Sequence, residues 1–409
     1  MMSNIPEGYK QTEVGVIPEE WEVKKLGDIS EIIMGQSPAG NSYNQNANGI
    51  ALINGPTEFT EKYPIKIQWT TLPTKLCKEG DILLCIRGSS TGRMNISNES
   101  YCIGRGVAAI RAKVNSDGSF LEFQVQNAVK KILVLTTGST FPNIDGKSLK
   151  NIEIAVPPLP EQQAIASALS DVDALITALE QLINKKRDIK QGAMQQLLTG
   201  KKRLPGFSGE WEIKKLGEIA DVKTGPFGSS LHERDYVVDG TPIITVEHLG
   251  ERGVVHENLP MVSDFDKNRL NAYALQADDI VFSRVGSVDR NSLIKEKENG
   301  WLFSGRLLRI RLNTKYIFPA YLSYYFHQEP TKQRIRSVAV GQTMASLNTE
   351  ILKNIEVAFP PTVKEQIAIA HILRDMDTEI EALEQKRDKY RALKQGMMQE
   401  LLTGKTRLV

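Results

Sequence analysis

The 409-residue sequence is poor in the side chains that mark metal sites and redox chemistry. It has five histidines without metal-ligand spacing and three cysteines without a CxxC pair, Cys77, Cys85 and Cys102. We expect reduced, packed thiols and no metal site. The alternatives are an incidental disulfide or metal contact of the cysteines, and a metal held by three histidines of the second half, His232, His248 and His256.

Long apolar runs and a strong net charge are also missing. The amino terminus has no stretch of signal-peptide length, and the most apolar runs, such as 132–135, have the size of a strand. We therefore expect a cytoplasmic protein without a membrane partner. A net charge of +2 argues only weakly for nucleic acid, so any anion-binding surface has to be local. The length predicts two or more domains.

Catalytic signatures are absent as well. Gly-Lys-Ser at 146–148 and Gly-Lys-Thr at 404–406 lack the glycine five residues earlier that a phosphate-binding loop needs. There is no GxGxxG after a strand and no Asn-Pro-Pro-aromatic box for a flipped adenine. The sequence therefore predicts a binding protein. The alternatives are a stand-alone enzyme that cuts or methylates DNA, with Glu296 and Glu298 in a partial nuclease set, and an adaptor that does not bind DNA.

What the sequence does contain is an internal repeat. WEVKKLGDIS at 21–30 returns as WEIKKLGEIA at 211–220, and EQQAIASALSDVDALITALEQ from Glu161 returns as EQIAIAHILRDMDTEIEALEQ from Glu365, 204 residues later. The stretches between these blocks share little beyond a glycine-led start and an apolar strand end. We infer a duplicated scaffold that carries two diverged surfaces.

Each repeat ends in a long amphipathic helix. Prolines at 157, 158 and 160 and at 360 and 361 mark the helix starts, and Gly200 and Gly404 follow the helices. The apolar stripes are wide enough to need covering, so we expect the helices to pack on each other as an antiparallel coiled coil about a pseudo-two-fold axis. The alternative is that each helix packs on its own domain. The predicted packing residues are Ile165, Leu169, Val172, Ile176, Leu179, Ile183, Ile369, Leu373, Met376, Ile380, Leu383 and Tyr390.

These features predict an α+β protein with two α/β recognition domains separated by two long helices. We place the domains at 21–156 and 205–359, and the helices at 157–204 and 360–409. The segment 1–20 is expected to pack near the carboxyl-terminal end, because it stands before WEVKKL as 205–210 stands before WEIKKL.

Local clusters of arginine and amide side chains are the candidates for DNA contacts. Arginines recur beside Gly-Ser turns in both repeats, where they suit phosphate oxygens and guanine edges. The loop at 36–48 is rich in Asn and Gln, which suit adenine, although a plain solvated loop is the alternative. The predicted DNA-binding residues are Gln36, Asn41, Tyr43, Asn44, Gln45, Arg87, Ser89, Ser90, Arg93, Arg105, Thr140, Ser229, His232, Arg234, Arg284, Ser287, Arg290, Arg306, Gln342 and Thr343.

The duplicated WEVKKLGDI and WEIKKLGEI, PPLPEQQAIASAL and PPTVKEQIAIAHIL, and KQGxMQxLLTGK resemble the specificity subunit of type I restriction–modification systems over nearly the whole length. The resemblance implies two target-recognition domains that read a split, asymmetric sequence of double-stranded DNA. It also implies two methyltransferase subunits, which modify adenine with S-adenosylmethionine, and restriction subunits that use ATP and Mg²⁺. No cofactor is expected in this chain itself.

Overall fold

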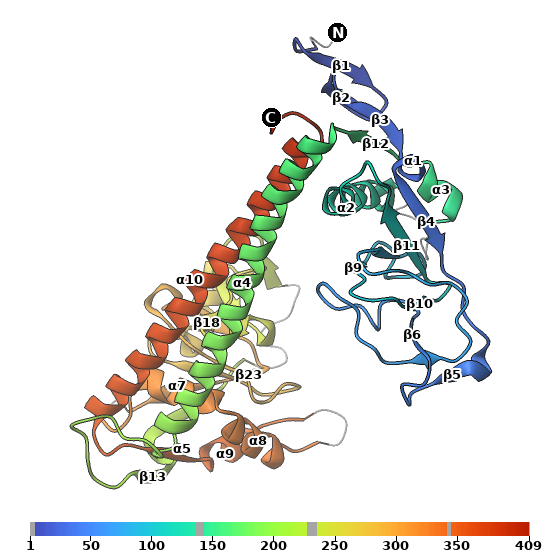
Figure 1. Cartoon of the computed structure of the whole chain (residues 1–409). Coiled ribbons are helices and arrows are strands. Elements are labelled where there is room, and N and C mark those ends of the chain that lie inside the picture. The colour runs from blue at the N-terminus through green and yellow to red at the C-terminus, as the bar shows by residue number, and fades with distance from the viewer. Residues whose placement is uncertain (1–4, 136–142, 227–234, 314, 342–344, 409) are drawn as a thin grey trace. The chain divides into compact units, whose positions relative to one another are not determined.

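The structure, a computed structural model, describes residues 5–135, 143–226, 235–313, 315–341 and 345–408. The chain forms two compact units (Figure 1). Unit 1 consists of Met1–Leu179 and Lys386–Val409, and unit 2 of Glu180–Gln385. Each unit therefore contains one globular domain and a part of each long helix, α4 (Leu159–Leu197) and α10 (Val363–Leu401).

Unit 1 is built on two four-stranded sheets. The first has the order β4-β11-β8-β9 and is antiparallel, and the second has the order β10-β6-β7-β5 with β6 and β10 parallel. The first sheet comprises β4 (Ser30–Met34), β11 (Val107–Ala112), β8 (Ile82–Cys85) and β9 (Met94–Ile96). The second comprises β10 (Cys102–Ile103), β6 (Ile50–Ile53), β7 (Trp69–Thr70) and β5 (Tyr43–Asn44).

The central strand β11 shows why the first sheet is buried on both faces. Ala108 and Ile110 pack into one apolar cluster with Leu121 of α2 (Gly118–Leu135), while Val107 and Ala109 pack into another with residues of the second sheet. Side chains alternate between the faces of a strand, so a strand covered on both sides reads as a continuous apolar run. Helix α2 lies next to one end of β11 in Figure 1.

Smaller elements complete unit 1. Strand β3 (Glu22–Lys25) pairs with β12 (Glu153–Val156), and two short helices, α1 (Leu26–Ile29) and α3 (Gly146–Lys150), lie beside them. The hairpin of β1 (Tyr9–Thr12) and β2 (Gly15–Pro18) packs against the end of α10. Its Tyr9 hydroxyl donates to the Gly404 carbonyl at 3.0 Å, and Ile17 shares an apolar cluster with Leu401 and Leu402.

Unit 2 repeats this topology. Its antiparallel sheet has the order β14-β23-β20-β21, and its second sheet has the order β15-β19-β16-β22 with β16 and β22 parallel. The first comprises β14 (Ala220–Thr224), β23 (Leu307–Leu312), β20 (Ile280–Ser283) and β21 (Asn291–Leu293). The second comprises β15 (Tyr236–Val237), β19 (Met261–Val262), β16 (Thr241–Ile244) and β22 (Leu302–Phe303).

The remaining elements of unit 2 have counterparts in unit 1, with two additions. The paired strands are β13 (Glu212–Lys215) and β24 (Glu356–Phe359), and the helices are α5 (Leu216–Ile219), α7 (Pro319–His327), α8 (Glu329–Val338) and α9 (Thr349–Lys353). The additions are helix α6 (Asp264–Arg269) and the hairpin of β17 (Leu249–Gly250) and β18 (Gly253–Val254).

The predicted antiparallel helix pairing is confirmed within each unit. In unit 1, Ile165 and Leu169 of α4 share a cluster with Met398 and Leu401 of α10. In unit 2, Leu197 at the other end of α4 clusters with the start of α10. The start of one helix thus meets the end of the other, which excludes the alternative that each helix packs only on its own domain.

Burial along the predicted stripe is graded. Ile176, Leu179, Ile183, Ile369, Leu373 and Ile380 are buried like Ile165 and Leu169, and Val172, Met376, Leu383 and Tyr390 are half-buried. Both helices end where expected, because Gly200 and Gly404 take left-handed backbone angles (φ of 71° and 72°) that close the last turn.

The same ion pairs between the helices form in both units, with the lysine and the aspartate on opposite helices in the two cases. Lys190 binds Asp377 at 2.6 Å in unit 2, and Lys394 binds Asp173 at 2.6 Å in unit 1. Asp377 stands 204 residues after Asp173, as Lys394 stands after Lys190. Arg203 with Glu365 and Arg407 with Glu161 repeat the exchange at the helix ends. Each unit thus links the two helices with the same pairs of residue types.

Candidate nucleic-acid interface

Four strands of unit 1 end at the same place, where β11 begins. Strands β4 and β8 both run antiparallel to β11, and β10 runs parallel to β6 and leads directly into β11. Backbone hydrogen bonds of 2.9 Å tie the following residues together, from Gln36 N to Ile103 O and from Ile86 N to Gly106 O. We call the residues after these strand ends, Gln36, Asn54, Arg87 and 104–106, the carboxyl edge of unit 1.

Glycines make the close approach at this edge possible. A Cβ atom on Gly104 would lie 2.1 Å from Asn54 Oδ1, and one on Gly106 would lie 2.5 Å from the Asn54 carbonyl oxygen. Any larger residue would separate the strand ends. The tip that carries Arg105 is therefore packed directly on Asn54.

The corresponding residues of unit 2, Pro226, Thr245, Val285 and 304–306, form the carboxyl edge of unit 2. Ser304 N donates to Ile244 O at 2.9 Å, and Arg284 N donates to Arg306 O at 2.9 Å, as their counterparts do in unit 1. The Ser304 hydroxyl is buried without a partner among the described residues. The backbone of the edge is repeated while its side chains differ.

Three of the predicted arginines point to solvent. Arg87, Arg105 and Arg306 are exposed, and their guanidinium groups make no hydrogen bond or ion pair with the part of the chain that the structure describes. All three lie on or beside the carboxyl edges. They are therefore available to bind an anion such as a phosphate group.

The other predicted arginines are engaged inside the protein. Arg93 donates to Pro56 O at 3.3 Å and to Phe59 O at 3.2 Å. Its counterpart Arg290 donates to the Leu249 carbonyl, and Arg284 donates to Leu347 O and Gly305 O. A guanidinium that holds backbone carbonyls positions the loop it contacts, and it has fewer donors left for DNA.

Neighbouring basic residues are also used for stability. Arg111 binds Asp81 through two hydrogen bonds of 2.8 and 2.7 Å, and Arg311 binds Asp279 in the same way at 2.7 and 2.6 Å. Each aspartate raises the pKa of its arginine through these bonds. The local excess of positive charge counted along the sequence is therefore larger than the charge that unit 1 and unit 2 present to solvent.

Isolated bridges show which residues of the two repeats correspond after β8 and β20. Arg87 forms an isolated bridge with Asn143, and Val285 forms the matching bridge with Ser346. Arg284 therefore corresponds to the buried Ile86, not to Arg87. The turn after β20 is one residue shorter than the turn after β8: Ser283 N donates to Arg290 O, whereas Cys85 N donates to Arg93 O.

The amide-rich loop at 36–48 is organised by Asn44. Its Oδ1 accepts from the backbone of Asn46 at 3.2 Å and of Asn48 at 3.0 Å, and its Nδ2 donates to Asn48 O at 2.8 Å. The Tyr43 hydroxyl donates to Pro38 O. Gln36, Asn41 and Gln45 are exposed.

The predicted serines lie on the two turns that follow β8 and β20. Ser89 and Ser287 are exposed and Ser90 is half-buried. Six further predicted contacts lie outside the described residues: Thr140, Ser229, His232, Arg234, Gln342 and Thr343.

Sequence reasoning missed Asn54 of the carboxyl edge and its neighbour Gln68. Asn54 directly follows the apolar run of β6, and Gln68 directly precedes β7. Their side chains meet, with Asn54 Nδ2 donating to Gln68 Oε1 at 3.2 Å. The signal that could have located Asn54 is a polar residue at the end of a buried strand. The pairing with Gln68 requires the tertiary fold.

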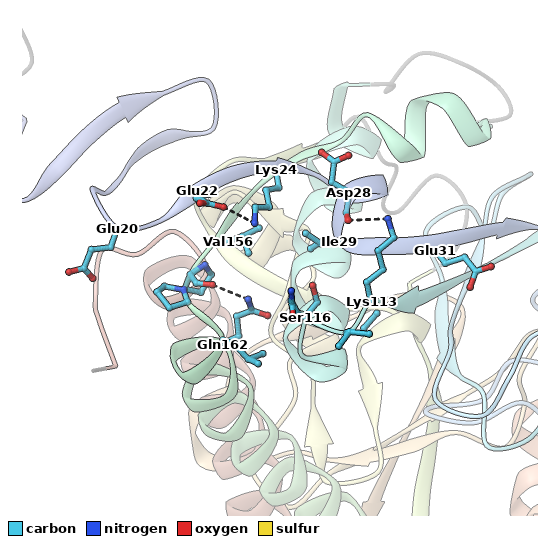
Figure 2. A pocket seen from close by; sticks show the side chains of 16 residues that line it. Glu20, Glu22, Lys24, Asp28, Ile29, Glu31, Lys113, Ser116, Val156 and Gln162 are labelled. Atoms are coloured by element: carbon cyan, nitrogen blue, oxygen red, sulfur yellow. Dashed lines mark hydrogen bonds and ion pairs between the residues drawn. The ribbon is translucent and has the colours of Figure 1, made fainter.

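A hollow of about 910 Å³ in unit 1 lies between β3, the loop after β11 and the start of α4 (Figure 2). Its charged groups are already paired: Lys24 binds Glu22 at 2.6 Å, and Lys113 donates to the carbonyls of Gly27 and Asp28. Gln162 donates to Pro157 O. Lys24, Glu22 and Lys113 are thus engaged within the protein.

The remaining chemical candidates have structural roles. The three cysteines are buried and free, and burial raises the pKa of the Cys85 thiol to about 11. His248 accepts from the Thr245 backbone, and Glu298 is buried against His256 at 2.7 Å. Among the described residues there is no cluster of His, Cys, Asp or Glu suited to a metal ion, and no helix long and apolar enough to cross a membrane.

Comparison with known proteins agrees with this architecture. The model of the type I restriction modification DNA specificity domain matches the chain twice, over residues 18–190 and 208–389. The MjaVIII type I restriction enzyme specificity subunit of Methanocaldococcus jannaschii is 24% identical over 98% of this chain and 96% of the relative. A putative MjaX specificity subunit of the same organism is 39% identical over 48% of this chain and 47% of the relative.

A solved structure shares the fold. The crystal structure of the S subunit of a type I restriction–modification system from M. genitalium has a TM-score of 0.60 and 17% identity, and covers 93% of this chain and 96% of its own. Because the family model matches most of the chain in two copies, this protein belongs to the family of type I restriction–modification DNA specificity subunits and has two recognition domains.

Proposed function

We propose that this chain reads an asymmetric, bipartite sequence in double-stranded DNA, with one carboxyl edge on each half-site. The observation that carries the proposal is the repeated edge. Unit 1 and unit 2 build it from the same strand ends and equip it with different side chains. Two edges with the same backbone and different side chains are suited to two half-sites of different sequence.

The free arginines supply the electrostatic part of this binding. Arg87 and Arg105 in unit 1 and Arg306 in unit 2 would contact phosphate groups or guanine edges. Binding through such groups releases counterions, so the affinity should fall steeply as the salt concentration rises. A chain whose binding to DNA does not depend on salt would favour the alternative of an adaptor that spaces two protein partners.

We further propose that the helix pair recruits two copies of an adenine methyltransferase subunit. The exchanged ion pairs, such as Lys190 with Asp377 and Lys394 with Asp173, make the two faces of the pair equivalent. Equivalent faces accept two copies of one partner. S-adenosylmethionine would bind to that partner, and restriction subunits with ATP and Mg²⁺ would join through it. This assembly would act on cytoplasmic DNA.

The same arrangement assigns a spacer role to α4 and α10. Both helices begin in one unit and end in the other. Four residues inserted into each helix would add about 6 Å of rise, which corresponds to one or two base pairs of DNA. The non-recognised spacer between the half-sites should lengthen accordingly.

Co-expression with the methyltransferase subunit encoded beside this chain tests the proposal. Methylated adenines are then mapped by single-molecule sequencing. The expected result is a split, asymmetric motif with one modified adenine in each half-site. Co-purification without any modified site would refute DNA reading by these two subunits. Modification or cleavage by this chain alone, with S-adenosylmethionine and Mg²⁺, would support the alternative of a stand-alone enzyme.

A further inference from the structure

The side-chain amides of Asn54 and Gln68 are hydrogen-bonded to each other beside the carboxyl edge of unit 1. Both residues are half-buried. The main chain beneath them is fixed, because Leu52 N donates to Gln68 O at 2.8 Å, and Gly104 and Gly106 press on Asn54. The hydrogen bond from Asn54 Nδ2 to Gln68 Oε1 then sets the orientation of the Gln68 amide.

This orientation leaves the recognition groups of Gln68 unused. Its Nε2 carries two hydrogens that have no acceptor among the residues the structure describes, and its Oε1 keeps a second lone pair. Donor and acceptor stand side by side at a partly solvent-accessible position. An amide in this state can accept from adenine N6 and donate to adenine N7 in the major groove.

We propose that Gln68 reads an adenine in the half-site of unit 1, and that Asn54 is the residue that positions it. This inference rests on the proposed DNA-reading function. It adds the identity of one recognised base, adenine, and the major-groove edge at which that base is read. Exposed Arg105, on the tip that packs against Asn54, would contact the phosphate group or guanine beside that base.

At the equivalent positions of unit 2, both of which the structure describes, the amide pair is replaced by Pro260 and Thr245. Ile243 N donates to Pro260 O at 2.8 Å, as Leu52 N does to Gln68 O, so Pro260 stands in the place of Gln68. Thr245 stands in the place of Asn54, and its hydroxyl and backbone N–H contact His248 Nδ1 at 2.9 and 3.1 Å. The adenine contact should therefore act on one half-site only.

Gln68→Glu is the sharpest test, because glutamate keeps the size and the acceptor for Asn54 but loses both donors. The variant is co-expressed with the methyltransferase subunit, and the methylated motif is mapped as for the wild type. We expect modification of wild-type sites to fall about 5- to 150-fold, with discrimination lost at one A·T pair of one half-site. A carboxylate accepts from cytosine N4, so methylation of sites with C·G at that position should increase.

Two variants separate reading from positioning and from structure. Asn54→Ala keeps the Gln68 amide but frees it to rotate, so the same base should stay preferred with a smaller loss. Asn115→Asp makes the same change from amide to acid as a matched control on the loop after β11, at the far end of that strand from the carboxyl edge, and should leave the motif unchanged.

The outcomes distinguish this inference from the proposed function. If the wild-type complex methylates no split motif, the proposed function fails. If it does and Gln68→Glu leaves motif and rate unchanged, or weakens all sequences equally, or alters both half-sites, the adenine contact is wrong. Should Gln68→Glu not fold, as judged by circular dichroism, Gln68→Ala replaces it and must show the same loss at one base pair.

Discussion

Replacing Arg407 with alanine should loosen the amino-terminal hairpin of unit 1. Glu161 is 3% exposed and accepts from Arg407 Nε at 2.6 Å, from Arg407 Nη2 at 2.9 Å and from the Trp21 indole at 2.9 Å. The carboxylate raises the pKa of Arg407 through these bonds. Without Arg407, a buried negative charge keeps only the indole N–H as a strong donor.

The size of the effect follows from that unpaired charge. Breaking a buried ion pair by removing one partner costs about 3–5 kcal/mol, and a hydrogen bond to a charged group contributes about 1.5–3 kcal/mol. The Arg407 side chain is 22% exposed, so water replaces part of what is lost. We therefore expect a loss of about 2–3 kcal/mol in the local stability of unit 1.

Hydrogen exchange followed by mass spectrometry measures this change locally. Exchange of peptides covering 5–20 should become about 30- to 150-fold faster in Arg407→Ala, while unit 2 keeps its wild-type rates. Arg203→Ala is the matched control, because Arg203 binds Glu365 at 2.6 Å in unit 2 and should loosen that unit alone. In a Glu161→Gln background, Arg407→Ala should increase the exchange rate of these peptides much less, since no buried charge remains. Unchanged exchange at 5–20, or full additivity of the two substitutions, would contradict the reasoning.

Three further predictions concern charge, pH and length. Arg105→Ala and Arg306→Ala should each lower the slope of log affinity against log salt by about 0.9, measured by fluorescence anisotropy with duplex DNA; an unchanged slope would show that these groups do not meet phosphates. Burial lowers the pKa of His327 to about 4, against about 6.5 in an unfolded chain. The unfolded state then binds more protons between these values, so unit 2 should lose up to about 1.4 kcal/mol of stability per pH unit as the pH falls from 6.5 to 4, and His327→Gln should remove this part of the slope in urea unfolding. Inserting four residues into both α4 and α10 should lengthen the methylation-motif spacer by about one to two base pairs, and an unchanged spacer would refute the ruler role.

The helices were predictable because their signals are local. Ile165 and Leu169 fall on a stripe of period 3.6, and the repeat supplies each helix with a partner of matching width. The limit of this reasoning is visible at Leu182 and Ile189, which lie on the same stripe and are 38% and 47% exposed. Periodicity predicts which face is apolar, but burial depends on what covers each position.

The carboxyl edges were only partly predictable. The local cluster of arginines makes Arg105 a candidate, but the sequence does not show that Arg93 is tied to Pro56 and Phe59. Gln68 was missed because its place beside Asn54 depends on the antiparallel pairing of β6 with β7, two strands separated by a long loop. Long-range pairing of this kind leaves no local periodic signal.

The exchange of helix ends has a consequence for biosynthesis. The apolar cluster around Trp21 and Ile165 is completed by Met398 and Leu402, which the ribosome adds only after all of unit 2. Unit 1 therefore emerges first and is finished last, with the apolar stripe of α4 uncovered in the interval. A nascent chain in this state exposes a surface that chaperones bind, and a ribosome stalled before residue 386 would release a protein whose first unit cannot close.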